Sequence, residues 1–343
     1  MEAELSYVLL LFGLLVVPKI LQQFRMPPPI TAFGIGLICG MGFGVFTEDD
    51  TVPLLATFGI AALFLFAGLE VDGELLRRRS GILLSHLVMG LAALALTGVA
   101  VTLLLELGWR PGLLVALALL TPSTGFILET IDSLGATDEE KLWIKSKAIS
   151  TEIIALIVLF VALQSTSAAR LSLSAAALLA LIFALPLVFR FFAARIVPLA
   201  PNSEYAFVLM VAILCAYATR EMGVYYLVGA FVVGVAAQRF RHHSLDLSSE
   251  RMFQAVQVFA SFFVPFYFFH AGLEIPKEAF GMEGAVTGII LLLAVTPLRI
   301  GMYMVHRRLV LGERWKKSTR VAVPLLPTLV FTLVIASILR ERY

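Results

Sequence analysis

A single glutamate interrupts an apolar stretch of the chain. Glu152 lies in residues 148–160, which read Ala-Ile-Ser-Thr-Glu-Ile-Ile-Ala-Leu-Ile-Val-Leu-Phe. A charged side chain at the bilayer centre costs about 2.5–3.5 kcal/mol even on forgiving insertion scales, and such residues usually mark an ion or proton path. Because removal from water favours the protonated carboxyl group, Glu152 could hold a proton or a cation but hardly both. The alternative is a neutral or paired glutamate that joins two helices.

The composition of the chain indicates that Glu152 lies within a membrane. The 343 residues are 60% hydrophobic and 15% charged, and the mean hydropathy is +0.95. Soluble domains are about 45–50% apolar and about 25% charged. The chain also divides into apolar runs of about 20 residues, the length that crosses a bilayer as a helix. We therefore predict an all-α polytopic membrane protein.

Twelve transmembrane helices are expected from these runs. Most of the 26 lysine and arginine residues then fall on one side, which the positive-inside rule makes cytoplasmic, with both termini outside. The first five residues contain no basic n-region, so we predict no cleaved signal peptide. The predicted spans are residues 5–24, 30–46, 52–72, 80–106, 112–134, 142–164, 172–192, 203–219, 224–238, 253–274, 284–305 and 320–339.

Two sequence matches predict an internal repeat. Ala-Gly-Leu-Glu occurs at residues 67–70 and 271–274, toward the ends of the third and tenth spans. Pro122 and Pro327 lie in the fifth and twelfth spans, within Leu-Thr-Pro-Ser-Thr and Leu-Leu-Pro-Thr. Spans that are seven apart cross the membrane in opposite directions, as in an inverted-topology repeat, which places the substrate site near the midplane between interrupted helices.

The two prolines are the candidate helix breaks. A proline removes one backbone hydrogen bond and leaves a carbonyl that needs another partner. Hydroxyl groups lie beside both prolines and could serve the site, or they could simply bond back to the backbone of an ordinary kinked helix. The hydroxyl residues are Thr121, Ser123 and Thr124 beside the first proline, and Thr328 and Thr332 beside the second.

Three further charged residues belong to the predicted spans. Arg299 is expected roughly 10 Å from the cytoplasmic end of the eleventh span, at 1.5 Å per helical residue. Its side chain either reaches the cytoplasmic surface or forms a salt bridge with an acid inside the bundle, for which Glu152 is the candidate. Glu70 and Glu129, toward the cytoplasmic ends of their spans, could line an acidic funnel that attracts cations, or they could be ordinary interfacial charges.

Nothing in the sequence indicates catalysis. There is no HExxH motif, no phosphate-binding loop and no Ser-His-acid set. Cys39 and Cys215 offer neither a disulfide framework nor metal-site spacing. His86 and His270, within predicted spans, are interpreted as hydrogen-bonded packing residues. We therefore predict no enzyme activity, no cofactor and no nucleic-acid partner.

Three segments, in their order and spacing, carry a resemblance to one transporter family over most of the chain: Arg-Met-Pro-Pro-Pro-Ile-Thr-Ala-Phe-Gly-Ile-Gly at 25–36, Leu-Phe-Ala-Gly-Leu-Glu-Val-Asp at 65–72 and Leu-Val-Gly-Ala-Phe-Val-Val-Gly at 227–234. The chain is similar to the second family of monovalent cation:proton antiporters, which includes the Kef-type potassium/proton antiporters. The resemblance implies crossed broken helices and an elevator-like movement within a single transmembrane domain, residues 1–343. The implied parts are a dimerisation part (1–79 and 203–280), a mobile core (80–164 and 284–339) and a linker helix (172–192). Residues 25–36 resemble the start of the family's second span. Residues 65–72 resemble its "GLELD" segment, and residues 227–234 resemble its "GAFLAG" stretch.

The resemblance also implies site residues. The family's ion-binding acid is the second residue of a pair in the sixth span, which here is Thr151-Glu152. Glu152 would then bind the proton and the metal ion in turn, and the Thr151 hydroxyl could contribute to the site. The family's basic residue in the eleventh span falls on Arg299. The polar break in the fifth span falls on Thr121, Ser123 and Thr124.

Two departures from the family pattern bear on function. A glutamate stands where the family has an aspartate, which moves the carboxylate about one methylene further out. The family's thirteenth span and cytoplasmic regulatory domain have no counterpart in the sequence.

We predict a homodimeric secondary transporter of a prokaryotic inner membrane that exchanges K⁺ or Na⁺ for protons, one for one because there is one carrier acid. One alternative is an ion-coupled symporter of a small organic anion that Arg299 binds. Another is a transport-inactive sensor or assembly subunit.

Overall fold

The computed structural model describes most of the chain. The described residues are 2–24, 26–71, 80–124, 127, 131, 136–200, 203–223, 226–241 and 250–342. Within these ranges the regular structure is helical, and no strand occurs. The chain forms two compact units: unit 1 comprises residues 1–71 and 173–282, and unit 2 comprises residues 72–172 and 283–343. Helix α10 (Ala168–Arg195) contains the point where the chain passes from unit 2 to unit 1.

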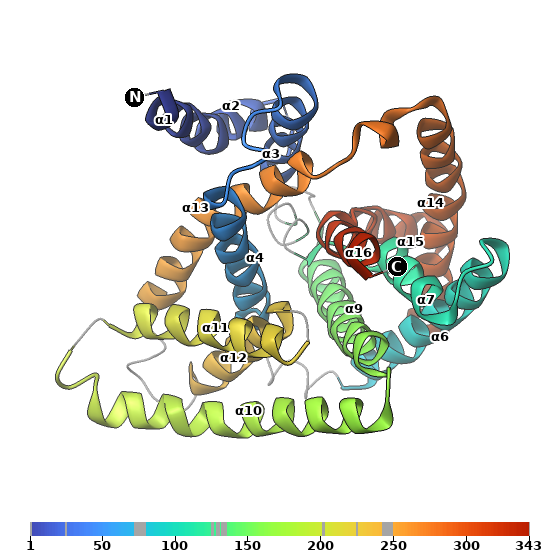
Figure 1. Ribbon diagram of the computed structural model, residues 1–343. Helices are drawn as coiled ribbons and strands as arrows, with labels where there is room; N and C mark the ends of the chain where they lie inside the picture. Colours follow the sequence, from blue (N-terminus) through green and yellow to red (C-terminus); the bar gives the residue numbers. More distant parts are fainter. Residues whose placement is uncertain are drawn as a thin grey trace. The chain divides into compact units, whose positions relative to one another are not determined.

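Unit 1 is built around the helix α4 (Thr51–Leu69). Helix α13 (Glu250–Leu273) packs against both α4 and α3 (Pro28–Leu37), while α12 (Tyr226–Arg241) packs against α4 on another side. Segments that are about 200 residues apart in the sequence therefore pack together within this unit (Figure 1). The remaining helices of unit 1 are α1 (Glu2–Leu15), α2 (Val17–Gln22), the π-helix η1 (Ile38–Phe43), α11 (Glu204–Glu221) and the 3₁₀-helix η3 (Lys277–Phe280).

Glycines allow the closest contacts in unit 1, and they include both glycines of the repeated Ala-Gly-Leu-Glu. A Cβ atom on Gly68 of α4 would stand 2.3 Å from the carbonyl oxygen of Phe231 in α12. A Cβ atom on Gly272 of α13 would stand 2.3 Å from the carbonyl oxygen of Phe33 in α3. Small residues that let backbones approach are typical of helix packing in membranes. The two tetrapeptides thus make equivalent contacts, as a repeat requires.

Unit 2 holds the predicted site residues from the two breaks and from the sixth span. Helix α9 (Asp138–Gln164) begins with a capping box, in which the Thr137 side chain accepts from the backbone N–H of Glu140 and the Glu140 side chain accepts from that of Thr137. Helix α6 packs against α7 and α9, and α16 packs against α7. The other helices of unit 2 are α6 (Ser80–Leu104), α7 (Trp109–Leu120), α14 (Met282–Leu311), α15 (Trp315–Ala322), the 3₁₀-helix η4 (Val323–Leu325) and α16 (Leu329–Arg342).

Each of the predicted spans overlaps at least one observed helix. Among the described residues, seven helices are long and apolar enough to cross a membrane. An eighth span would be the pair Trp315–Leu325 and Leu329–Arg342, which is bent by 50° at its break. Shorter apolar helices cover Pro28–Phe43, Trp109–Leu120 and Tyr226–Gln238. The chain is therefore a multi-pass membrane protein, whereas the count of twelve spans stays a prediction, as does the division into a dimerisation part and a core.

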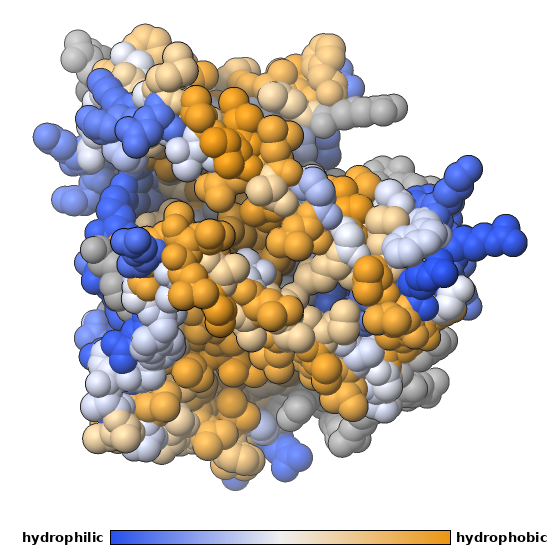
Figure 2. All heavy atoms as spheres, turned by 90° about the vertical axis from the view of Figure 1, so that its right-hand side faces the viewer, coloured by the Kyte–Doolittle hydropathy of each residue, from blue (hydrophilic) through white to orange (hydrophobic). Residues whose placement is uncertain are grey.

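Apolar side chains cover the outside of the long helices. The most apolar windows of α6 and α10 are each only 11% buried, and that of α14 is 6% buried. On the face shown in Figure 2, apolar side chains form a broad area, and hydrophilic ones gather at its margins. A large exposed apolar surface is favourable in contact with lipid but not with water.

Candidate functional site

Two interrupted helices of unit 2 meet at their non-helical segments. Helix α7 ends at Leu120, and residues 121–123 continue without helical structure. Residues 326–328 likewise separate η4 from α16. The backbone N–H of Ser123 donates to the carbonyl oxygen of Pro327 at 2.7 Å, so one break supplies a hydrogen-bond partner for the other. The hydroxyl of Thr332 in α16 donates to the carbonyl oxygen of Ala118 in α7 at 2.9 Å and strengthens this crossing.

The predicted hydroxyl residues of the first break are all buried. Thr121, Ser123 and Thr124 each have less than a twentieth of their surface exposed. The side chain of Thr124 interacts with the carboxylate of Glu152 in α9. The contact falls short of hydrogen-bond geometry, since Thr124 Oγ1 and Glu152 Oε2 have no hydrogen-bond partner among the described residues. The acid from the sixth predicted span therefore lies beside the break in the fifth.

Glu152 itself is almost closed to solvent, with 5% of its surface exposed. The carboxylate has no ion-pair partner in the part of the chain that the structure describes. No group of three or more His, Cys, Asp or Glu side chains that could hold a metal ion occurs there either. The Thr124 hydroxyl is the oxygen group that the structure shows beside the carboxylate, and helix ends such as those at the two breaks leave backbone carbonyls without an intrahelical partner. Such a set of hard oxygen ligands suits a small hard cation.

The Thr151 side chain is turned to its own helix. Its hydroxyl donates to the carbonyl oxygen of Lys147 at 2.9 Å, one turn earlier in α9. Thr151 is also only partly buried, unlike its neighbour Glu152. The structure therefore brings Glu152 and Thr124 together and uses the donor of Thr151 elsewhere. A role for Thr151 in ion binding stays a prediction.

Arg299 forms hydrogen bonds with the backbone at the second break. Its guanidinium donates from Nη1 to the carbonyl oxygen of Leu326 at 2.5 Å and from Nη2 to that of Leu325 at 2.6 Å. The side chain is 4% exposed, so it does not reach the aqueous surface. Nor does an ion pair join it to Glu152 among the described residues. The physical reason is local: a helix end leaves carbonyls unpaired, and the fork of an arginine satisfies two of them at once.

The predicted acidic funnel is not tested by the described residues. Glu70 follows the last residue of α4 and is half-buried in unit 1. Glu129 lies outside the described residues. The funnel stays a prediction.

Sequence reasoning missed a buried cluster on another side of α9. Lys147 is buried and donates from Nζ to the carbonyl oxygen of His86 in α6 at 3.3 Å. The His86 ring is fully buried, with its centroid 4.9 Å from the Trp143 ring and 5.0 Å from the His306 ring. The signal that was available is the four-residue spacing of Trp143 and Lys147, which places both on one helical face.

Interrupted helices that meet beside a buried carboxylate, in a chain covered with apolar helices, define a polytopic membrane protein of the transporter type. The sodium/hydrogen exchanger, transmembrane family matches residues 7–342. The chain belongs to this family, whose members are cation:proton antiporters. The Kef-like subtype that the sequence suggested is not shown.

Several known proteins resemble the chain. The probable Na⁺/H⁺ antiporter 3 of Methanocaldococcus jannaschii is 24% identical, over 98% of this chain and 88% of that protein. The Na⁺/H⁺ antiporter NhaS5 of Synechocystis is 26% identical over 91% of this chain, which spans only 45% of that longer protein. The solved structure of the sodium proton antiporter MjNhaP1, also from Methanocaldococcus jannaschii, has a TM-score of 0.73 at 16% identity and covers 100% of this chain and 88% of that one. This last likeness shows the shared fold.

Proposed function

We propose that the chain exchanges a monovalent cation for protons across a prokaryotic cell membrane, with Glu152 as the shared binding site. The observation that supports this best is the position of the Glu152 carboxylate, buried beside Thr124 where two interrupted helices meet. A carboxylate that gives up its proton can receive a cation, and one that holds its proton cannot. Binding is therefore mutually exclusive, which couples the two ions.

We infer that sodium is the preferred cation. The resemblance found in the sequence left potassium and sodium open, but the relatives in the comparison are named as Na⁺/H⁺ antiporters. A single carrier acid predicts that one cation moves for one proton, so that exchange is electroneutral. Homodimerisation through unit 1 and an elevator-like movement of unit 2 belong to the same proposal.

The nearly closed environment of Glu152 sets a requirement on the transport cycle. With 5% of the residue exposed, ions cannot exchange with water in this conformation. Transport therefore needs at least one other conformation in which the carboxylate is open to one side of the membrane. Such alternation between two accessible states is how inverted-repeat transporters work.

An anion symporter is less well supported than an antiporter. That alternative needs the Arg299 guanidinium to face a substrate anion. Both terminal nitrogens of Arg299 instead donate to the carbonyl oxygens of Leu325 and Leu326. Binding an anion would leave these buried carbonyls unpaired, at about 1–3 kcal/mol for each group.

Cation-driven proton movement in proteoliposomes tests the proposed function. The wild-type protein should change the internal pH when a Na⁺ gradient is applied, and Glu152→Gln should abolish this change while the protein stays folded. The matched control is Glu283→Gln, which removes an exposed carboxylate in the first turn of α14 and should leave exchange unchanged. Silence of the wild type with Na⁺, K⁺ and Li⁺, or wild-type activity of Glu152→Gln, would contradict the proposal. A current that reverses with membrane potential would contradict electroneutrality alone.

A further inference from the structure

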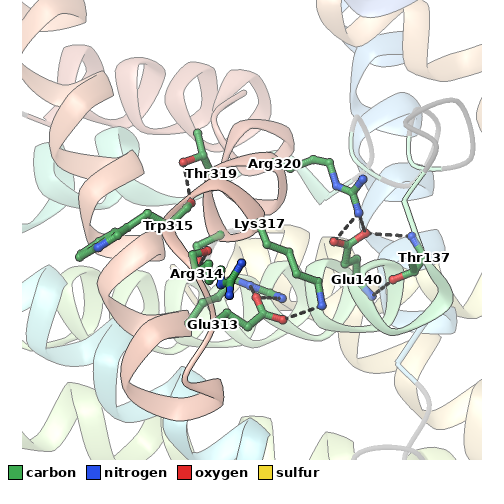
Figure 3. A network of polar contacts seen from close by, with 10 residues as sticks. Thr137, Glu140, Glu313, Arg314, Trp315, Lys317, Thr319 and Arg320 are labelled. Atoms are coloured by element: carbon green, nitrogen blue, oxygen red, sulfur yellow. Dashed lines mark hydrogen bonds and ion pairs between the residues drawn. The ribbon is translucent and has the colours of Figure 1, made fainter.

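Ion pairs join three helices of unit 2 far from Glu152. At the beginning of α9, both carboxylate oxygens of Glu140 accept from Nη2 of Arg320 in α15, each at 2.6 Å (Figure 3). One of these oxygens also accepts from the backbone N–H of Thr137 at 2.9 Å. Glu140 is only 1% exposed, whereas the Arg320 side chain is 53% exposed. A buried carboxylate therefore depends on a partner that comes from another helix.

A second ion-pair group lies beside the first. The buried Arg307 at the end of α14 donates from Nε at 2.9 Å and from Nη2 at 2.5 Å to one oxygen of Glu313. Lys317 in α15 lies 3.0 Å from the other oxygen (Figure 3). Burial tends to raise the pKa of Glu313, but the hydrogen bonds from Arg307 and Lys317 outweigh it and hold the pKa below its ordinary value. Glu313 is therefore ionised at neutral pH.

The two groups line one cavity. Glu140, Arg307, Glu313 and Lys317 all border a space of about 140 Å³ between the end of α14 and the starts of α9 and α15. Where a cavity separates helices, packing alone fixes their relative position less firmly than in a filled core. Charge-assisted contacts with fixed geometry can supply the missing constraint.

The same three helices lead to the candidate exchange site, with Glu152 in the middle of α9 and Arg299 in the middle of α14. Twelve residues of α9 separate Glu140 from Glu152, which corresponds to about 18 Å along a helix. Eight residues of α14 separate Arg307 from Arg299, or about 12 Å. Arg320 lies six residues before the break that begins at Leu326. Because a helix is stiff along its axis, a contact near its beginning or end fixes the position along the axis of side chains several turns away.

We propose that the Glu140–Arg320 ion pair is a positioning contact for ion exchange, which sets the height of the Glu152 carboxylate relative to the break at residues 326–328. This inference rests on the proposed function of Glu152. It assigns Glu140 and Arg320 no contact with the transported ion. The ion pair acts through α9 and α15, which hold the site residues in place. Loss of the pair should therefore weaken cation binding.

Transport kinetics provide the first test. In proteoliposomes with wild-type exchange as the reference, Arg320→Gln and Glu140→Gln should each raise the apparent KM for Na⁺ by about tenfold, since displacement of a site group by about 1 Å can cost up to 100-fold. The double variant should show no further increase, because either single change already removes the pair. The matched control is Arg314→Gln, which removes an exposed arginine one residue before α15 and should keep the wild-type KM. A KM in Arg320→Gln equal to that of the control would overturn the positioning role, as would additive effects in the double variant.

A distance measurement tests positioning without any need for transport. Spin labels at Ile157→Cys in α9 and Val323→Cys at the end of α15 would be placed on exposed positions, after Cys39 and Cys215 have been replaced by alanine. Arg320→Gln should broaden or shift the distance distribution between the labels. A distribution identical to that of the parent protein would overturn the inference, even if the wild type moved no ions and the proposed function had failed. A changed distribution in a protein without exchange would support the contact and reject only its link to cation transport.

Discussion

The backbone N–H of Ser123 donates to the carbonyl oxygen of Pro327 at 2.7 Å, and this bond joins the interruptions of two helices that lie some 200 residues apart in the sequence. Neither segment can complete its hydrogen bonds within its own helix. In a membrane interior, non-helical backbone is tolerated only where protein or a cavity supplies partners. The crossing therefore satisfies the backbone, and the contact between Thr124 and Glu152 lies beside it.

The contact between Thr124 and Glu152 predicts that one threonine of the site matters more than the other. Thr124→Val, which removes the hydroxyl at nearly constant volume, should raise the apparent KM for Na⁺ by about fivefold to tenfold, the effect of losing roughly 1 kcal/mol of binding. Thr124→Ser should restore most of the affinity. The measurement is Na⁺-dependent proton movement in proteoliposomes.

Thr151→Val is the matched comparison for that experiment. The Thr151 hydroxyl donates to the Lys147 carbonyl oxygen, so its removal should leave the apparent KM within about twofold of wild type, as expected for an exchange of one local hydrogen bond. A larger increase of KM in Thr151→Val than in Thr124→Val would contradict this prediction. It would support the role of Thr151 in ion binding that the family resemblance implies, and it would show that ions bind in a conformation with other contacts around Glu152.

Arg299 should contribute to stability through the carbonyls that it satisfies. Arg299→Gln leaves the carbonyl oxygens of Leu325 and Leu326 without its N–H donors and should lower the free energy of unfolding by about 3 kcal/mol, at roughly 1–3 kcal/mol for each buried group. Thermal unfolding in detergent would show this as a lower Tm. Arg190→Gln, at an exposed position of α10, is the control.

A double variant distinguishes this role from an ion pair with Glu152. If Arg299 were the counter-charge of Glu152, then Arg299→Gln combined with Glu152→Gln would be less destabilised than the sum of the single changes. The structure predicts that the two effects add, because the described contacts of Arg299 go to the backbone.

Because α4 and α12 approach closely at Gly68, a single added methyl group at this position should destabilise the protein. In Gly68→Ala the new Cβ would stand 2.3 Å from the Phe231 carbonyl oxygen and 2.9 Å from Gly234 Cα, so the two helices must move apart. Overpacking of this kind typically costs about 1–3 kcal/mol. Gly34→Ala in α3, where nothing lies within 4 Å of the new Cβ, should leave the Tm unchanged or raise it slightly. Equal Tm values for the two variants would contradict the predicted packing.

Asp49 should make stability depend on pH at the start of α4. Its Oδ1 accepts from the backbone N–H groups of Thr51 and Val52, each at 2.8 Å, and its Oδ2 accepts from the Tyr7 hydroxyl. Burial tends to raise the pKa of Asp49, but these hydrogen bonds outweigh it and lower the pKa below the ordinary value. A carboxyl group with a lowered pKa contributes stability above its unfolded pKa, about 3.9 for aspartate, and the contribution is lost as the pH falls through the lower folded value.

Asp49→Asn removes the charge and the acceptor of the Tyr7 hydroxyl, whereas the amide oxygen can still accept from the backbone N–H groups of Thr51 and Val52. The variant should have a lower Tm than wild type at pH 6, and the difference should shrink as the pH is lowered below about 4. Asp49→Ala, which also removes the acceptor of the Thr51 and Val52 backbone N–H groups, should be less stable at every pH, by about 0.5–2 kcal/mol, as for the loss of a capping side chain. A pH-independent difference between wild type and Asp49→Asn would show that the charge contributes nothing.

Local sequence features carried most of what could be predicted about the helices. Apolar runs long enough to span a bilayer located the helices in order, because every backbone polar group in lipid must be satisfied within a helix. Pro122 and Pro327 likewise mark positions at which the structure is non-helical, because proline lacks the backbone donor. The partner of Arg299 could not be predicted in this way. A guanidinium can donate to any nearby carboxylate or carbonyl oxygen, and which of them is near depends on how α14 packs against η4 and the break that follows it.

By itself, then, the sequence determined that this is an all-helical membrane protein with a lone acid at position 152 and two proline-marked interruptions, since these properties depend on composition and on neighbours along the chain. Only the tertiary structure decided that Glu152 lies beside Thr124, that Arg299 holds Leu325 and Leu326, and that Glu140 is paired with Arg320. Each of these contacts joins residues more than 20 positions apart. Their formation depends on the packing of whole helices, which hydropathy and local motifs do not encode.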